Sequence, residues 1–161
     1  FAAYDSCLQW KDDNVMALNN YAYYLSEKGV DLHKAESMSY KTIKAEPNNG
    51  TYLDTYAWIL FMEERYADAK TYIDQALKNR DSTADNSTVL EHAGDIYYMN
   101  GMADESVDFW KKAYTGENQT EVLAWKIKNR QYITGEELKK RNAPKQKPAA
   151  TKKSVRKGKK K

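Results

Sequence analysis

A chain of 161 residues is long enough for one compact unit with a buried core. Only seven Gly and three Pro occur, which favours helix, because these two residues penalise helix interiors most. The single cysteine, Cys7, excludes an internal disulfide and a cysteine-based zinc site. No apolar run approaches the roughly 18 residues that a membrane-spanning helix needs, so we expect a soluble protein.

The net charge of +3 conceals an uneven distribution of charged residues. The last nineteen residues, 143–161, carry nine Lys or Arg and no acid, whereas the rest of the chain carries 17 basic and 23 acidic residues. The sequence therefore combines an acidic body with a basic C-terminal tail, and the two parts are better considered separately.

Three stretches repeat one pattern, which begins at Leu18, Leu53 and Leu90. In each, the residue four positions after the leucine is small, and the residue seven positions after it is large and apolar or aromatic. The first unit, for example, reads Leu18-x2-Tyr21-Ala22-x2-Leu25. A turn residue comes eleven positions after the leucine, and a small residue then opens a second helix. These pairs are Gly29 and Ala35, Glu64 and Ala69, and Gly101 and Ser106.

The pattern of small residues has a physical reason. Two antiparallel helices approach closely only where small side chains face each other, while larger residues at helical spacing form a stripe that packs on the next pair. We therefore expect close crossings inside each pair. The facing residues should be Ala22 and Ala35, Ala57 and Ala69, and Gly94 and Ser106.

This register resembles the tetratricopeptide-repeat family, and in particular its bacterial members. The usual Trp of the family is Leu in all three units, and the closing Pro survives only at Pro47. The resemblance implies an all-α, right-handed superhelical solenoid of antiparallel helix pairs. Its units in chain order are the second helix of a truncated preceding repeat at 1–14, repeats at 15–49, 50–86 and 87–120, a capping helix at 121–142, and a disordered basic tail at 143–161.

In this family the first helix of each pair lines a concave groove that binds a peptide or a partner protein. Mapped onto this chain, the resemblance predicts an aromatic floor with acidic walls. The predicted groove residues are Asn19, Tyr23, Ser26, Asp54, Trp58, Phe61, Glu91, Asp95 and Tyr98. An alternative interpretation is that several of these aromatic residues only fill contacts between successive first helices.

The chaperone-binding members of the family carry Lys, Asn and Arg in this groove, as a clamp for a terminal carboxylate. This chain has Asp54, Trp58, Glu91 and Asp95 at those places. The clamp is therefore absent, and we expect an acidic ligand tail to be repelled. A partner with basic and apolar side chains fits better.

Other chemistry receives little support from the sequence. His92 and Asp95 share a helix face beside Glu91, but no third metal ligand with suitable spacing is evident. We interpret His92 as a partly buried histidine beside a helix seam. No phosphate-binding glycine loop, paired-histidine helix or nucleophile elbow occurs, so we expect a non-enzymatic protein without metal or cofactor.

The sequence leaves two alternatives to a groove-binding scaffold. The basic tail at 143–161 would make the chain an adaptor that docks on nucleic acid or on an anionic surface, since each neutralised phosphate releases counterions. Otherwise, the repeats would only position an enzymatic domain on the N-terminal side. The resemblance to bacterial members suggests the bacterial cytoplasm or periplasm, between which the sequence does not decide.

Overall fold

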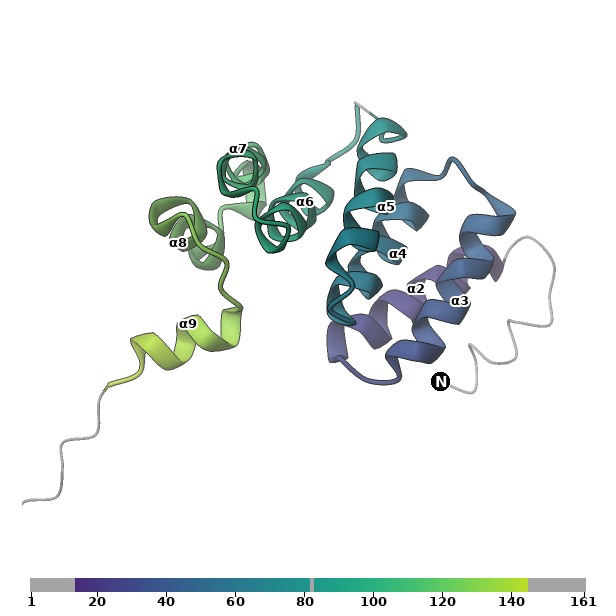
Figure 1. Ribbon diagram of the computed structural model, residues 1–161, viewed down its shortest axis with the longest axis horizontal. Helices are drawn as coiled ribbons and strands as arrows, with labels where there is room; N and C mark the ends of the chain where they lie inside the picture. Colours follow the sequence, from purple (N-terminus) through teal and green to yellow (C-terminus); the bar gives the residue numbers. More distant parts are fainter. Residues whose placement is uncertain (1–13, 82, 145–161) are drawn as a thin grey trace, which may run out of the picture.

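A computed structural model of the chain describes residues 14–81 and 83–144. Within these residues the fold is all-α, with eight α-helices packed in pairs and no strand (Figure 1). The segment 1–13, predicted as part of a truncated repeat, lies outside the described residues, and so does the tail from 145 to 161. The three pairs are α2 (Asn14–Lys28) with α3 (Leu32–Ala45), α4 (Gly50–Met62) with α5 (Tyr66–Lys78), and α6 (Ser87–Met99) with α7 (Ala103–Ala113).

The turn inside each pair has one shared geometry. Gly29, Glu64 and Gly101 take left-handed backbone φ angles of 63°, 62° and 77°. The residue after each of them donates its N–H to the carbonyl five positions earlier, at 2.9 to 3.2 Å. This is the Schellman arrangement that ends helices. In the middle repeat the turn residue is Glu64, for which a left-handed φ costs more conformational energy than for glycine.

The residues predicted at the close crossings are buried, since Ala22, Ala35, Ala57, Ala69 and Ser106 have no exposed surface. At the third crossing the helices are closer still, because a Cβ added to Gly94 would overlap the indole of Trp110 and lie 3.0 Å from the carbonyl oxygen of Ser106. Because glycine has no Cβ, the Trp110 ring can be buried at this crossing.

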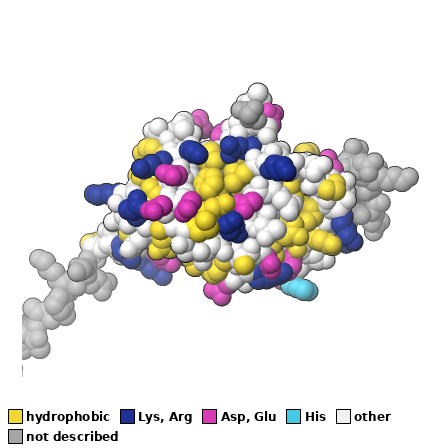
Figure 2. Space-filling model, turned by 45° about the horizontal axis from the view of Figure 1, so that its top comes forward, with side chains coloured by type: hydrophobic (Ala, Val, Ile, Leu, Met, Phe, Trp, Pro, Cys, Tyr) yellow, Lys and Arg dark blue, Asp and Glu magenta, His cyan; other side chains and the backbone are white. Residues whose placement is uncertain are grey.

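Successive pairs stack through both of their helices. The second helix of one pair contacts the first helix of the next, and the first helices α2, α4 and α6 contact one another in turn. The largest core cluster lies at the middle pair and includes Leu53, Leu60, Ile73 and Ile96, which are at most 2% exposed. The surface differs from this core. On the face shown in Figure 2, hydrophobic patches lie among charged side chains.

The C-terminal region differs from the prediction of one capping helix at 121–142. A short 3-10 helix, η1 (Gly116–Asn118), leads into α8 (Glu121–Asn129), and a separate helix α9 (Gly135–Asn142) follows. The break has two local causes. Arg130 takes a left-handed φ of 54°, and the Thr134 hydroxyl accepts a hydrogen bond from the Glu137 N–H at 3.1 Å, which caps α9.

Gly94→Ala should destabilise the fold by about 1–3 kcal/mol, because the added methyl displaces the Trp110 ring from a closely packed site. Chemical denaturation measures this difference. Gly135→Ala is the control, since its Cβ would meet only the Val122 methyl at 3.7 Å. Equal unfolding free energies for the two variants would show that the α6–α7 crossing is not tightly packed.

Candidate functional site

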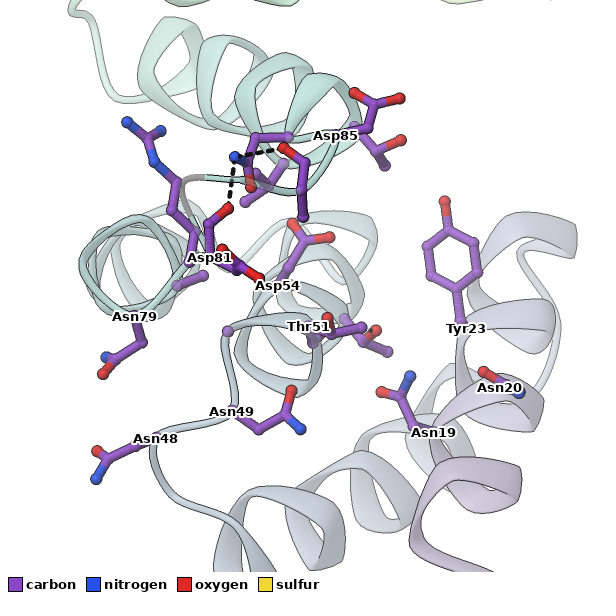
Figure 3. A pocket seen from close by; sticks show the side chains of 18 residues that line it. Asn19, Asn20, Tyr23, Asn48, Asn49, Thr51, Asp54, Asn79, Asp81 and Asp85 are labelled. Carbon is purple, nitrogen blue, oxygen red and sulfur yellow. Dashed lines mark hydrogen bonds between the residues drawn. The ribbon is translucent and has the colours of Figure 1, made fainter.

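A cavity of about 610 Å³ lies between α2, α4 and the segment that joins α5 to α6 (Figure 3). Most of its described lining residues are Asn, Asp or Thr. The first helices α2 and α4 provide one part of this lining, and the start of α6 provides another. The cavity is therefore bordered by the three helices that the sequence assigned to a binding groove.

The nine predicted groove residues divide into three groups. Asn19, Tyr23 and Asp54 line the cavity. Trp58, Glu91 and Tyr98 are half-buried. Ser26, Phe61 and Asp95 are buried, at 0%, 5% and 3% exposure.

Ser26, Phe61 and Asp95 require a correction, because these three side chains are buried and do not line the cavity. The Ser26 hydroxyl donates to the carbonyl oxygen of Tyr23 at 2.6 Å, so it is used within its own helix. Phe61 stacks on Trp58 and contacts Tyr132 edge-on. At least one of the aromatic residues predicted to line the groove, Phe61, therefore packs inside the protein.

Trp58 joins two successive first helices. Its ring lies parallel to the Phe61 ring at 4.7 Å and to the His92 ring at 4.1 Å between centroids. Since His92 belongs to α6, this stack links α4 to α6. For Trp58 the structure therefore favours the alternative interpretation, a contact between repeats, although part of the side chain remains exposed.

Asp54 is paired with His92. Its Oδ1 lies 2.9 Å from His92 Nδ1, and both side chains are largely buried. Burial alone lowers the pKa of His92, but Asp54, Asp95 and Glu91 outweigh this effect and raise the pKa above its ordinary value. These carboxylates therefore stabilise the charged form of His92, and the pair links α4 to α6.

Lys126 of α8 is a site residue that the sequence analysis missed. It is 3% exposed, and its Nζ lies 2.8 Å from Asp95 Oδ1 and 3.3 Å from Glu91 Oε1. Asp95 also accepts a hydrogen bond from Trp110 Nε1 at 3.0 Å. Burial raises the pKa of Asp95, while the Lys126 ammonium opposes this shift. Because Leu123, Lys126 and Ile127 share one helix face, the apolar stripe of α8 was a signal that Lys126 faces inward.

These contacts change the electrostatic character of the site. Glu91 and Asp95 are matched by Lys126, and Asp54 is matched by His92 at one of its two oxygens. The acidic walls are therefore partly neutralised from inside the protein. In residues 14–81 and 83–144, no three His, Cys, Asp or Glu side chains are grouped so as to hold a metal ion.

Lys126→Ala should lower the free energy of unfolding by about 3–5 kcal/mol, because it leaves the buried Asp95 carboxylate without a cation. Thermal or chemical unfolding measures the effect. Lys128→Ala is the matched control on the same helix, where an exposed lysine should contribute less than about 0.5 kcal/mol. A similar small loss in both variants would mean that Lys126 is solvated in solution.

The His92–Asp54 pair should make stability depend on pH. The folded state raises the pKa of His92 above 6.5. The stabilisation that protonated His92 gives to the fold is therefore complete below about pH 6.5, and it is lost as the pH rises through the raised pKa. Wild-type unfolding free energy should therefore fall across this window. His92→Gln should flatten the profile in the same window, and an unchanged profile would show that His92 does not carry the effect.

The comparisons with known proteins agree with this architecture. No family model matches the chain. Over 66 residues, 41% of the chain, it is 35% identical to a TPR repeat-containing protein of Pseudomonas aeruginosa, and the match spans 11% of that relative's length. The described part of the chain contains no helix that is both long and apolar enough to span a membrane.

Solved structures share the fold at low sequence identity. The first TPR domain of human RPAP3 matches with a TM-score of 0.61 and 13% identity, over 72% of this chain and 88% of that one. The first TPR of Spaghetti (RPAP3), bound to the HSP90 peptide SRMEEVD, matches with a TM-score of 0.62 and 13% identity, over 72% and 89% of the two chains. At this identity the likeness is one of fold.

Proposed function

We propose that this chain, a tetratricopeptide-repeat protein, binds a segment of a partner protein along its first helices α2, α4 and α6. The observation that carries the proposal is the polar cavity of about 610 Å³ between these helices and the α5–α6 segment. A cavity of this size holds several side chains or a stretch of peptide. The peptide held by the similar Spaghetti domain supports the same use of the fold.

The charges favour a partner that is basic and apolar, and not one with an acidic tail. The peptide held by that domain carries two Glu and an Asp in SRMEEVD. Here Asp54 lines the cavity, and the half-buried Glu91 follows on α6. Carboxylates at these places repel an acidic ligand, while the half-exposed faces of Tyr23 and Tyr98 offer apolar contact area.

The partner segment, in this proposal, gains affinity from aromatic and backbone contacts and selectivity from charge. Exposed ion pairs each contribute only about 0–1 kcal/mol, so the carboxylates mainly set orientation and association rate. The basic tail at 143–161 is itself a cationic segment, and it competes for the same surface as a weak ligand. Docking of that tail on nucleic acid remains the alternative, and binding that depends on the tail and on low salt would favour it.

The test replaces exposed residues at the rim of the cavity. We expect Asn20→Arg with Thr51→Arg to weaken a basic, aromatic-containing peptide, selected from a library on the full chain, by about tenfold or more, since both residues line the cavity and are exposed. Calorimetric titration gives the dissociation constants.

The control adds the same charge to the second helices. Ser37→Arg with Thr71→Arg changes exposed residues of α3 and α5, outside the cavity lining, and should leave the dissociation constant within about twofold. The reverse pattern, loss only in the α3/α5 variant, would place the partner on the second helices and overturn the proposal.

A further inference from the structure

The cavity contains a buried hydrogen-bond acceptor, the side-chain oxygen of Asn19. Asn19 is 4% exposed and lines the cavity, and within residues 14–81 and 83–144 its Oδ1 has no hydrogen-bond partner. Figure 3 shows its amide directed from α2 toward α4. A buried acceptor without a donor costs free energy, and a ligand that supplies an N–H removes that cost. The terminal torsion of asparagine has broad minima, so a rotation about it would direct Oδ1 toward a ligand in the cavity.

The charge of the lining is negative. Asp54, Asp81 and Asp85 line the cavity, and among the described lining residues Arg80 is the one basic residue. Hydrogen bonds from Thr83 lower the pKa of Asp81, and hydrogen bonds from Ser87 lower the pKa of Asp85. Both carboxyl groups are therefore ionised at neutral pH.

Tyr23 lines the cavity from α2. Burial is the main cause that raises the pKa of its hydroxyl, and the carboxylates of Glu27, Asp54 and Glu91 raise it further. These three carboxylates add negative charge near the ring. A cation in front of this ring gains from the carboxylates and from the ring face together.

The segment that closes the cavity is held in place by its own hydrogen bonds. Asn86 Nδ2 donates to the carbonyl oxygens of Asp81 and Ala84 at 3.0 and 3.1 Å, which Figure 3 draws as dashed lines. The Asp81 carboxylate accepts from the Thr83 backbone N–H at 2.9 Å. These hydrogen bonds restrain the described residues around Asp81, and a restrained binding group favours a defined ligand over diffuse attraction.

We propose that this cavity binds one arginine side chain of the partner segment. The guanidinium donates to Asn19 Oδ1 and to the carboxylate of Asp54, beside the ring of Tyr23, and the rim aspartates attract the charge. Arginine fits better than lysine, because its planar group offers five N–H donors in a fixed fork, is less strongly hydrated and stacks on aromatic rings. This inference rests on the proposed function and specifies the partner's chemistry.

The test uses small probes on the 161-residue chain. N-acetyl-arginine amide should shift backbone amide NMR signals of the cavity segments of α2 and α4, and its lysine counterpart should bind more weakly. The citrulline counterpart keeps the shape of arginine but lacks its charge, and it should bind about tenfold more weakly or not at all. Equal shifts from arginine and citrulline, or arginine shifts elsewhere only, would overturn the inference.

Two variants and a control assign the effect to the named residues. Asn19→Leu removes the unpartnered acceptor at nearly constant size, so the unfolding midpoint should be unchanged or raised while arginine affinity falls about tenfold. Asp54→Asn should weaken arginine likewise, but it also removes the partner of His92, so its fold is checked first. Asp108→Asn removes an exposed charge on α7 and should change nothing. Unaltered arginine binding in folded Asn19→Leu would refute the site.

The outcome separates this inference from the groove proposal. If the rim variant at Asn20 and Thr51 loses the selected peptide while arginine probes give no shifts, the groove binds a partner without an arginine pocket. If arginine probes bind but no peptide depends on the rim, the pocket stands and the partner-binding proposal fails.

Discussion

The fold depends on close contact between two helices at one point in each repeat. At the third crossing the added Cβ of any residue but glycine would overlap the Trp110 ring, and at the other two the facing alanines are fully buried. Between repeats, larger and polar side chains make the contact, since Trp58 of α4 stacks on His92 of α6 and Asp54 meets the same imidazole. Small residues thus join the helices within a pair, and polar and aromatic residues join successive pairs.

Helix pairs and turns were predictable from the sequence because each rests on a local rule. A small residue at a crossing, or a residue with left-handed φ eleven positions after the leucine, acts within one repeat and recurs in all three. The C-terminal helices were harder. Arg130 ends α8 with a backbone conformation that arginine rarely adopts, whereas the Thr134 cap with Glu137 three residues later was a readable signal.

The sequence predicted that the groove residues share one face of the first helices. It did not predict which of them are buried and paired inside the protein. Repeat register places Asp95 on the same face as Asp54, yet one is 3% exposed under Lys126 and the other lines a cavity. Lys126 lies 31 residues from Asp95 in the chain. No period within a repeat connects them, because α8 is not a repeat unit. The carboxylates that face a ligand can only be distinguished from those used internally once α8 is in position.

The two ends of the first-helix surface therefore differ in chemistry. Toward α8, Lys126 supplies the cation that Glu91 and Asp95 require, and the stacked rings of Trp58, Phe61 and His92 complete the packing. Toward α2, Asn19 has an acceptor without a donor among the described residues, and Asp81 and Asp85 of the α5–α6 segment outnumber Arg80 in the described lining. In this view Lys126 neutralises the carboxylates of Glu91 and Asp95 inside the fold, and a cation of the partner would neutralise the carboxylates that line the cavity. A bound segment would then have a direction, with its basic side chain at the α2 end and its apolar side chains toward Tyr98.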